Sequence, residues 1–450
     1  MTLSNGLAAS WGRLVAVAVS LVVMAGCQSS SKTTTPTATP VDNTAPVEVG
    51  PLNASTPYLP YPNGVYTTVT VCLPGTLVCQ TIPNILVDTG SVGLRVLYSA
   101  LGNLEPELTV LTESGTQDQL LECVQFADFS YTWGPVALAS VQIAGETATQ
   151  VPGSNLNIGI PIQIIPANEE FPVPSSGSLS CLSSPPGNGT VIDDNTLETL
   201  GANGILGVGL FPQDCGNDCG PASGNVPNQY YYCANGAPCQ VAAVPLQYQV
   251  WNPVAAFSSS DNNGVLLTLH SVAAGGAPSV TGSLIFGIGT QSNNALGSAT
   301  IYATDQYGNF PTIDFNGVQY NSPANGSFID SGSSAIYFSD ATTLGIPECL
   351  DQQGNATGYY CPSSTLQYMV TPHGANGSTS SVSFSIANAA TLFSSGNAAL
   401  STLGGDSGAG PSTDYVDLGL PFFFGRPVFV GIAGSTVPNN ASAPFGYWAF

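Results

Sequence analysis

Two short segments of this chain have residue types and spacing that suit acid–base chemistry. Residues 85–91 read ILVDTGS, and residues 327–334 read SFIDSGSS. In each segment an apolar run ends in Asp, as a buried strand would end in a tight turn. Two such turns can bring Asp88 and Asp330 face to face. Carboxyl groups about 3 Å apart cannot both ionise, so one could activate water while the other protonates a carbonyl.

A simpler interpretation of the same residues is that each Asp only caps the backbone of its own turn, as Asx turns do after strands. Two copies with matching apolar lead-ins and a matching Ser after the Gly favour the paired interpretation. If the two carboxyl groups face each other in the structure, the paired interpretation is favoured over two independent Asx turns.

The elements that must position these turns are β-strands. Gly and Pro are abundant, at 51 and 35 residues, and charged residues make up only 7% of the chain. Alternating Val, Ile, Thr and Tyr broken by Asn-Gly turns predict an all-β fold. Short helices are expected only at residues 194–200 and 341–344. The duplicated Asp segment predicts two β lobes related by a pseudo-twofold axis.

Three further segments occur in an order that resembles the pepsin-like aspartic peptidases. Residues 204–209 (GILGVG) and 418–426 (LGLPFFFGR) resemble the two apolar-apolar-Gly segments of that family, and residues 282–287 (GSLIFG) resemble a strand near its lobe junction. The resemblance covers residues 57–437 and is closest to a bacterial, lipoprotein-type branch. It implies the bilobal pepsin-like fold.

The resemblance also implies the roles of the motif residues. Asp88 and Asp330 would hold the nucleophilic water, and no metal or organic cofactor would be needed. The supporting residues would orient the carboxyl groups, lock the two turns together and allow their tight bends: Thr89, Gly90, Ser91, Ser331, Gly332 and Ser333.

The chain departs from that family at three places. Arg95 stands where the family has Trp, and Asp417 stands where it has an aliphatic residue. No clean match exists for the flap Tyr, and Tyr131, within residues 126–134, is the candidate. A cation at Arg95 would lower the pKa values of the dyad; pairing with Asp128 is its alternative role.

The N-terminus is expected to be a targeting signal. Arg13 precedes an apolar run at residues 14–25, which is too short for a membrane span of about 20 residues. The following Met-Ala-Gly-Cys resembles a lipobox, with Cys27 acylated; an ordinary cleaved signal peptide is the alternative. These features predict the following domains: signal peptide 1–26, lipidated Cys27 with a disordered Ser/Thr/Pro-rich tether to residue 56, N-terminal β lobe 57–290 and C-terminal β lobe 291–450.

Cysteine usage agrees with export. Of 11 Cys, ten remain once Cys27 is set aside, and an even number in an oxidising compartment suggests up to five disulfides. A zinc site within residues 215–239 is the alternative. Connectivity does not follow from sequence, but close spacing suggests these pairs: Cys72 with Cys79, Cys215 with Cys219, Cys233 with Cys239, and Cys349 with Cys361, which leaves Cys123 and Cys181.

Charge and histidine content limit the function further. The formal net charge is −23, with only four Lys and Arg, which argues against nucleic-acid binding. The only two His, His270 and His373, are expected to be surface or strand residues, so a Ser-His-Asp hydrolase is poorly supported. We expect a monomer in the bacterial envelope, lipid-anchored, with the outer membrane favoured by Gln28.

Three functions follow from these observations. The first is an envelope-anchored aspartic endopeptidase that acts on peptides or proteins. The second is that of a catalytically inactive protein with the same fold, which binds a peptide, glycan or protein partner in the cleft. The third is a β-rich structural or adhesion protein without a paired-Asp cleft.

Overall fold

The apolar residues that precede the first aspartate form a strand buried at its end. β3 (Cys79–Asp88) finishes in four consecutive buried residues, and β4 (Val92–Leu97) is buried along its whole length. β11 (Gly204–Val208), which lies between them, is also fully buried. A strand covered on both faces favours apolar side chains on both faces, and the buried Arg95 of β4 is the charged exception. This is why the sequence shows a continuous apolar run here.

The structure is a computed structural model that describes residues 43–50, 61–154, 158–166, 171–183, 191–323, 326–338, 344–408, 414–440 and 442–450. These residues belong to one unit, Val41–Phe450. The predicted signal peptide, Cys27 and most of the predicted helix at 341–344 lie outside the described residues.

Eighteen strands are connected by backbone pairing in the largest sheet. Its strands are β1 (Thr44–Val49), β2 (Val65–Cys72), β3, β4, β5 (Thr109–Val110), β6 (Gln119–Gln125), β7 (Ser130–Ile143), β8 (Glu146–Ala148), β9 (Ile160–Ile165), β10 (Ile192–Asp193), β11, β12 (Tyr230–Cys233), β13 (Gln240–Val241), β14 (Gly264–Leu269), β15 (Val280–Phe286), β16 (Ile301–Ala303), β27 (Val428–Gly431) and β28 (Tyr447–Ala449).

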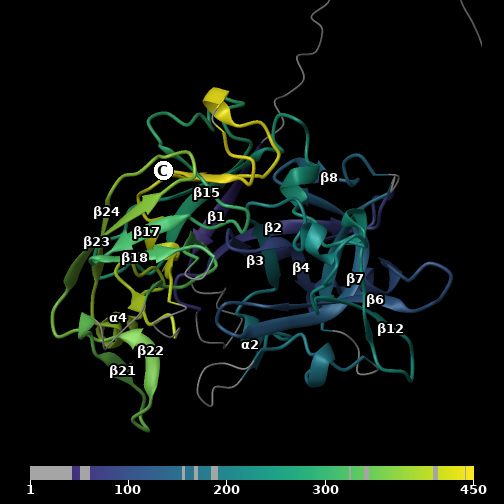
Figure 1. Ribbon diagram of the computed structural model, residues 1–450, viewed down its shortest axis with the longest axis horizontal. Helices are drawn as coiled ribbons and strands as arrows, with labels where there is room; N and C mark the ends of the chain where they lie inside the picture. Colours follow the sequence, from purple (N-terminus) through teal and green to yellow (C-terminus); the bar gives the residue numbers. More distant parts are fainter. Residues whose placement is uncertain are drawn as a thin grey trace, which may run out of the picture. The chain divides into compact units, whose positions relative to one another are not determined.

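Two smaller sheets lie beside it, and β17, β18, β23 and β24 are grouped at the left of Figure 1, opposite β6, β7 and β12. The four-stranded sheet holds β18 (Val318–Asn321), β17 (Thr312–Phe315), β23 (Leu366–His373) and β24 (Val382–Ile386). The six-stranded sheet holds β19 (Phe328–Ile329), β26 (Val416–Leu418), β20 (Ile336–Phe338), β25 (Gly404–Gly405), β22 (Ala356–Tyr360) and β21 (Glu348–Leu350).

Helices are few and short, so the prediction of an all-β protein is confirmed. The α-helices among the described residues are α1 (Tyr98–Leu101), α2 (Leu197–Leu200) and α4 (Ala389–Ser394). The 3₁₀ turns are η1 (Gly102–Glu107), η2 (Gly177–Leu179), η3 (Gly216–Cys219), η4 (Leu246–Tyr248), η5 (Pro253–Ala256), η6 (Leu420–Phe422) and η7 (Pro438–Asn440). The helix expected at 194–200 is present as α2, which begins after a capping box formed by Thr196 and Thr199.

The predicted tether is wrong for residues 44–49, which form β1. This strand pairs with β15 over six residues and with the start of β2. Its alternate residues Ala45, Val47 and Val49 are almost fully buried. The Thr/Pro-rich composition upstream had suggested a continuous extended segment, but the apolar alternation here is enough to add a strand.

The same local arrangement of three strands surrounds each aspartate. β11 pairs parallel with β3 and antiparallel with β4. β26 pairs parallel with β19 and antiparallel with β20. In both places the third strand therefore passes between the strands on either side of the Asp turn. Each Asp therefore comes at the end of a strand that is paired with this third strand.

Close approach of these third strands requires glycine. A Cβ on Gly207 would lie 2.7 Å from the backbone of Val92, and one on Gly419 would lie 2.0 Å from the carbonyl oxygen of Ala335. Both distances are far below van der Waals contact, so a side chain at either position would force the strands apart. The apolar-apolar-Gly pattern therefore has a direct steric cause.

The boundary predicted at residues 290 and 291 does not separate the sheets. β14, before it, pairs with β27, after it, from Gly264 with Gly431 to Leu267 with Val428. The strands of the two predicted lobes thus share one sheet. The division of the chain into two lobes stays a prediction.

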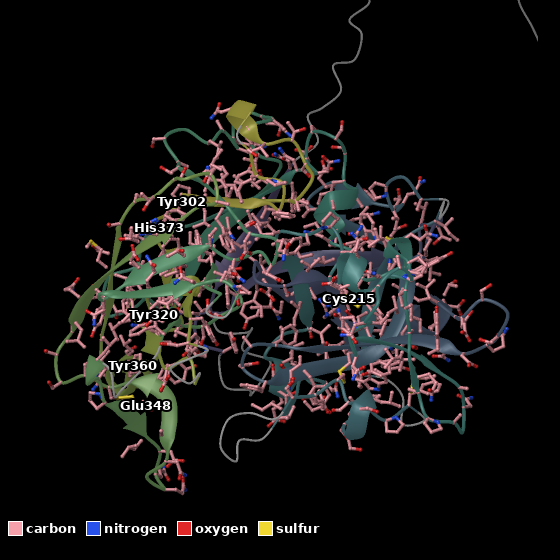
Figure 2. The ribbon with its side chains drawn as sticks, viewed as in Figure 1. Cys215, Tyr302, Tyr320, Glu348, Tyr360 and His373 are labelled. Carbon is pink, nitrogen blue, oxygen red and sulfur yellow. A yellow bond between two sulfur atoms is a disulfide. The ribbon has the colours of Figure 1, made fainter. Side chains whose placement is uncertain are left out.

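All ten cysteines among the described residues are paired in five disulfides, and this confirms the pairs suggested by spacing. They are Cys72–Cys79, Cys123–Cys181, Cys215–Cys219, Cys233–Cys239 and Cys349–Cys361. The zinc alternative for residues 215–239 is overturned, because a bridged sulfur is no thiolate ligand. Figure 2 marks Cys215 and draws the disulfides as yellow bonds.

The disulfides differ in the length of chain that they close, from 4 residues for Cys215–Cys219 to 58 for Cys123–Cys181. We expect the double change Cys123→Ser/Cys181→Ser to lower the free energy of unfolding by about 4 kcal/mol, because a long loop loses more entropy when it is closed. The matched change Cys215→Ser/Cys219→Ser should cost about 2 kcal/mol. Urea denaturation of wild type and the two double variants measures these free energies of unfolding. An equal loss of unfolding free energy in both variants would contradict the prediction.

Candidate functional site

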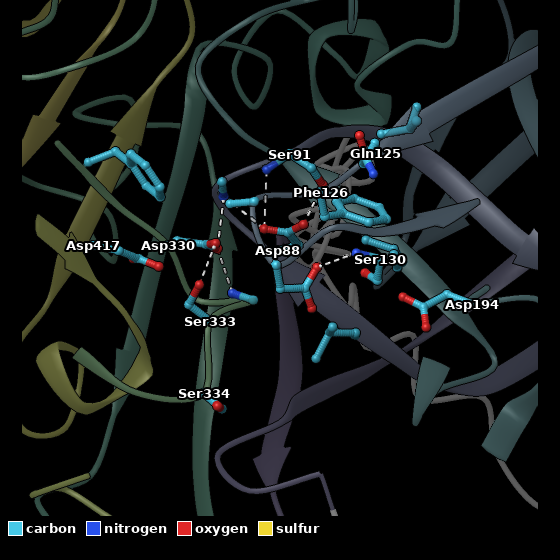
Figure 3. Close-up of a pocket in the computed structure, with 18 of the residues that line it drawn as sticks. Asp88, Ser91, Gln125, Phe126, Ser130, Asp194, Asp330, Ser333, Ser334 and Asp417 are labelled. Carbon is cyan, nitrogen blue, oxygen red and sulfur yellow. Dashed lines mark hydrogen bonds between the residues drawn. The ribbon is translucent and has the colours of Figure 1, made fainter. Parts of the chain in front are cut away.

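Asp88 and Asp330 lie face to face at the floor of a pocket, as Figure 3 shows. The Gly90 N–H donates to Asp88 Oδ1 at 2.8 Å and to Asp330 Oδ1 at 3.2 Å. One backbone N–H therefore reaches both carboxyl groups. The Gly332 N–H donates to Asp330 Oδ1 at 2.7 Å. The structure thus brings together two aspartates that are far apart in the sequence.

Each carboxyl group is also held by the serine three residues after it. The Ser91 hydroxyl donates to Asp88 Oδ2, and the Ser333 hydroxyl donates to Asp330 Oδ2 at 3.0 Å. Both contacts are drawn in Figure 3. Because the inner oxygen of each Asp accepts from backbone and the outer oxygen from a hydroxyl, neither side chain is free to rotate.

The two turns are locked together by reciprocal hydrogen bonds. The Thr89 N–H donates to Ser331 Oγ at 3.1 Å, and the Ser331 N–H donates to Thr89 Oγ1 at 2.9 Å. The Ser331 hydroxyl in turn donates to the carbonyl oxygen of Val87 at 2.7 Å. Thr89 and Ser331 are both almost fully buried. These contacts place the two loops at a fixed separation below the carboxyl groups.

Only glycine fits between the two aspartates. A Cβ on Gly90 would lie 2.5 Å from Asp330 Cγ, and one on Gly332 would lie 2.8 Å from Asp88 Cγ. Any side chain at either position would push the carboxyl groups apart. The Asp-Thr-Gly and Asp-Ser-Gly patterns are therefore explained by packing at the pair itself.

Burial raises the pKa of the Asp330 carboxyl well above its usual range, and the neighbouring charges of Asp88 and Asp417 raise it further. The hydrogen bond from the Gly332 N–H acts in the opposite direction but is weaker. A close pair of this kind titrates as a unit and keeps one proton over a wide pH range. The site can therefore offer one ionised and one protonated carboxyl group at the same time.

The pocket above the pair has a volume of about 710 Å³. Its lining includes the turn of the β6–β7 hairpin, residues 126–128, and the side chains of Tyr61, Phe211, Tyr337 and Tyr415. Seven carboxyl groups belong to the polar part of the lining: Asp88, Asp128, Asp194, Asp214, Asp330, Asp406 and Asp417. Arg95 is the one cationic side chain among the described residues that line it.

Tyr131 does not line the pocket, so its predicted place at the substrate is wrong. It lies on β7 and packs against Cys123, Trp133 and Phe171. Burial raises its pKa to about 12, helped by nearby Asp193. Successive residues of a strand point to opposite faces, and Ser130 faces the pocket.

Arg95 forms a buried ion-pair network that excludes its predicted alternative partner, Asp128. Its guanidinium lies 3.0 Å from Glu122 and 3.2 Å from Asp214, and it donates to the Val92 carbonyl oxygen at 2.7 Å. Asp128 instead accepts from the Ser130 N–H. The pKa of the Asp330 carboxyl is raised by burial and by its acidic neighbours, so the predicted lowering of the dyad pKa values by this cation is also wrong. The side chains of Arg95 and Glu122 are 1% and 0% exposed, respectively.

Sequence reasoning missed two residues that support the second turn. The Tyr61 hydroxyl donates to the Gly332 carbonyl oxygen at 3.0 Å, and Asn63 Nδ2 donates to the Ser334 carbonyl oxygen at 2.7 Å. Asn63 has a positive φ of 58°. The Pro-Asn-Gly sequence at 62–64 signals a turn, but nothing in it indicates which distant loop the turn contacts.

The two histidines lie away from the pair. His373, marked in Figure 2, lies on β23 with Nε2 2.7 Å from Asp314. His270 contacts the carbonyl oxygen of Thr281 through Nδ1. Neither lines the pocket, as the sequence predicted.

Fold and site together define an all-β protein with a partly buried aspartate pair in a pocket. The chain belongs to the family described as "Protein of unknown function (DUF3443)", which matches residues 39–450. No curated protein matches the chain. The assignment to the pepsin-like aspartic peptidases, made from short motifs, is corrected by this match, which is to a family of unknown function and does not indicate that superfamily. Within the described part of the chain, no helix has the length and apolar character to cross a membrane.

The Thr89–Ser331 lock can be tested without an assay of function. Thr89→Val keeps the side-chain shape but leaves the buried Ser331 N–H without its acceptor, so we expect a loss of about 1–3 kcal/mol in the free energy of unfolding. The control Thr89→Ser keeps the hydroxyl and should lose less. Chemical denaturation measures both. If Val and Ser cost the same, the hydrogen bond is not the cause of the loss.

Asp194 generates a prediction for pH dependence. Burial raises its pKa to about 7; the Ser130 hydrogen bond opposes this shift, and the charges of Asp128 and Asp193 add to it. An unfolded Asp has a pKa of about 3.9. The stability contributed by the protonated form is therefore complete below about pH 4 and is lost as the pH rises to about 7.

We expect Asp194→Asn to make the fall in unfolding free energy between about pH 4 and pH 7 shallower, by up to one proton or about 1.4 kcal/mol per pH unit. Urea denaturation at several pH values measures the slope. Glu107→Gln, at an exposed position, is the control and should leave it unchanged. An unaltered slope in Asp194→Asn would show that this carboxyl group titrates normally.

Proposed function

We propose that the protein hydrolyses peptide bonds with a water molecule activated between Asp88 and Asp330. The observation that carries the proposal is the Gly90 N–H that reaches both carboxyl groups, with a serine hydroxyl on the outer oxygen of each. A carboxyl pair costs free energy to bury. Because the pair lowers the stability of the fold, a catalytic role accounts for the two loops that hold it better than a purely structural role does.

The geometry supports a direct attack by water. The ionised member of the pair takes a proton from the water, and the water oxygen bonds to the peptide carbonyl carbon. The protonated member donates its proton to the carbonyl oxygen, which gives a neutral gem-diol and leaves one proton on the pair. In the collapse of this intermediate the protonated member gives its proton to the nitrogen, the C–N bond breaks, and the ionised member takes a proton from one gem-diol hydroxyl, which leaves one proton on the pair. No step needs a covalent intermediate.

The pocket supports a peptide-sized ligand. Its volume of about 710 Å³ falls in the range of roughly 300–1,000 Å³ that ligand sites occupy. Phe126 and Phe211 offer apolar contacts, and the 126–128 turn lines the same pocket as the pair. A polypeptide that places one carbonyl at the pair would lie between this turn and the tyrosines on the other side.

Two further parts of the proposal concern architecture and location. The matching strand arrangement around each Asp turn supports an origin of the site in two equivalent β lobes. The apolar run before Cys27 supports export to the bacterial envelope with a lipid anchor. Acylation of Cys27 would tether the enzyme to a membrane without a spanning helix.

A second function is favoured by one specific feature of the turns. Asp88 Oδ1 accepts from the N–H groups of Gly90 and Ser91, so each Asp also stabilises its own turn. A protein that only binds a peptide, glycan or protein partner could retain both aspartates for that reason. Cleavage of a peptide substrate would support the hydrolase, whereas binding without cleavage would support this second function.

The test is digestion of a peptide library by the purified full-length protein from about pH 2 to pH 7. We expect cleavage to be greatest in acid, because the pair must keep its shared proton. Asp88→Asn and Asp330→Asn should each reduce kcat/KM at least about a thousandfold, while circular dichroism stays unchanged. The exposed Asp218→Asn variant is the matched control and should cleave normally.

Cleavage that survives either pair substitution would rule out the pair as the catalyst. Absence of cleavage by folded wild type at every pH would favour the binding function. A hydroxyl-bearing analogue of the tetrahedral intermediate gives a second readout, since it should bind wild type and lose affinity for Asp330→Asn.

A further inference from the structure

One side of the pocket is formed by a single face of the six-stranded sheet. Asp417 on β26 is in register with Phe328 on β19 and with Tyr337 on β20. Residues two apart along an extended strand point to the same side, so Tyr415 lies on the side of Asp417, and Asp330 lies on the side of Phe328. All five residues line the pocket. This face therefore places a third carboxyl group and three aromatic rings beside the aspartate pair.

Asp417 offers an unsatisfied acceptor on this face. The residue is 3% exposed, and its Oδ1 atom has no hydrogen-bond partner among the described residues. Figure 3 shows its carboxyl group directed toward Asp330, within the pocket. Buried polar atoms are almost always hydrogen bonded, and an unpaired one costs free energy. A hydrogen-bond donor on a ligand in the pocket would satisfy this oxygen.

The described part of the protein has no cation free to pair with Asp417. Arg95 is the one cationic side chain among the described residues that line the pocket, and it is already paired with Glu122 and Asp214. A buried carboxylate is stable only when an opposite charge or hydrogen bonds compensate it. The pocket therefore lacks a positive group on the side of Asp417, and a basic group on the ligand is its chemical complement.

The aromatic rings on this face suit the same kind of ligand. Phe328 and Tyr415 stack with ring centroids 5.8 Å apart and an interplanar angle of 21°, and both are half-buried. The aliphatic stem of Lys or Arg packs along apolar surface, and the face of an aromatic ring attracts the charged end. Rings and a carboxyl group together can therefore hold both parts of a basic side chain.

The composition of the chain agrees with a preference for basic ligands. Its four Lys and Arg residues include Arg13 and Lys32, which precede the described residues. Arg95 is 1% exposed, and Arg426 is half-buried with its guanidinium 4.0 Å from the ring centre of Phe422. A peptidase that cleaves beside basic residues would thus meet no exposed basic residue in the described part of its own fold.

We propose that Asp417 determines specificity by binding the side chain of a Lys or Arg that flanks the scissile peptide bond. The ammonium or guanidinium donates to Asp417, and the stem packs against Phe328 and Tyr415. This inference rests on the proposed peptide hydrolysis and names its substrate class. Burial raises the pKa of Asp417, whereas a bound cation lowers it, so the basic side chain and the ionised carboxylate stabilise each other.

Matched peptides test this preference directly. Two series carry either Arg or citrulline, which has nearly the same shape without the charge, on the amino or on the carboxyl side of the scissile bond. We expect the purified full-length protein to cleave the Arg peptide of one series with a kcat/KM about 10- to 100-fold higher than its citrulline counterpart, as a hydrogen bond to a charged group provides. Equal kcat/KM values for Arg and citrulline in both series would overturn the proposal.

Variants then assign the preference to one side chain. Asp417→Asn keeps the volume and removes the charge, so the ratio of kcat/KM for Arg over citrulline should fall to near unity, while cleavage of the citrulline peptide shows that the variant is folded. Asp128→Asn removes another pocket charge, whose Oδ1 already accepts from the Ser130 N–H, and should keep most of the ratio. The exposed Asp218→Asn variant should keep all of it. An equal loss in Asp128→Asn and Asp417→Asn would overturn the proposal, because the total charge of the pocket would then set the preference.

Binding separates this inference from the hydrolase proposal. Calorimetry with uncleavable analogues, in which a hydroxyl-bearing group replaces the scissile bond, compares Arg with citrulline without any turnover. Cleavage of peptides with no preference for Arg would overturn the role of Asp417 and leave the hydrolase proposal intact. Selective binding of the Arg analogue that Asp417→Asn abolishes, without cleavage by wild type, would support the role of Asp417 and reject the hydrolase. Neither cleavage nor selective binding would reject both.

Discussion

The reciprocal hydrogen bonds between Thr89 and Ser331 are the interaction on which the site depends. They join two turns that lie 242 residues apart in the chain. Asp88 and Asp330 pay for burial and repel each other if both ionise, so they would separate unless their backbones were held. The lock lies directly below them and does not involve their own carboxyl oxygens. Those oxygens therefore stay available for backbone N–H groups, serine hydroxyls and a ligand.

The strands around the turns make that lock possible. At each Asp turn a third strand, β11 or β26, passes between the two strands that flank the turn. A glycine in or next to this third strand lets it approach the neighbouring backbone closely. Gly207 and Gly419 have the same role at equivalent positions. A buried strand cannot shift register against its partner without exposing apolar residues, so the position of each Asp is set by its strand pairing and not by its loop alone.

Charge in the pocket follows from the composition of the chain. With four Lys and Arg against 27 Asp and Glu, few cations are available to balance buried acids. The one in the pocket, Arg95, is paired with Glu122 and Asp214. Burial raises the pKa values of three pocket carboxyl groups, Asp194, Asp330 and Asp417, which favours their protonated forms. The charge of the pocket therefore becomes more negative as the pH rises and these groups ionise.

Local patterns in the sequence determined the all-β class, both Asp turns and the close disulfides, because each depends on residues near one another in the chain. Short motifs misjudged the family, since a few residues around a turn are shared by unrelated folds. Only the tertiary structure decided that Arg95 pairs with Glu122, that Tyr131 points into the core, and that Asp417 faces the pair. The physical reason is that a side chain's partners come from strands distant in sequence, and strand register chooses which face meets them.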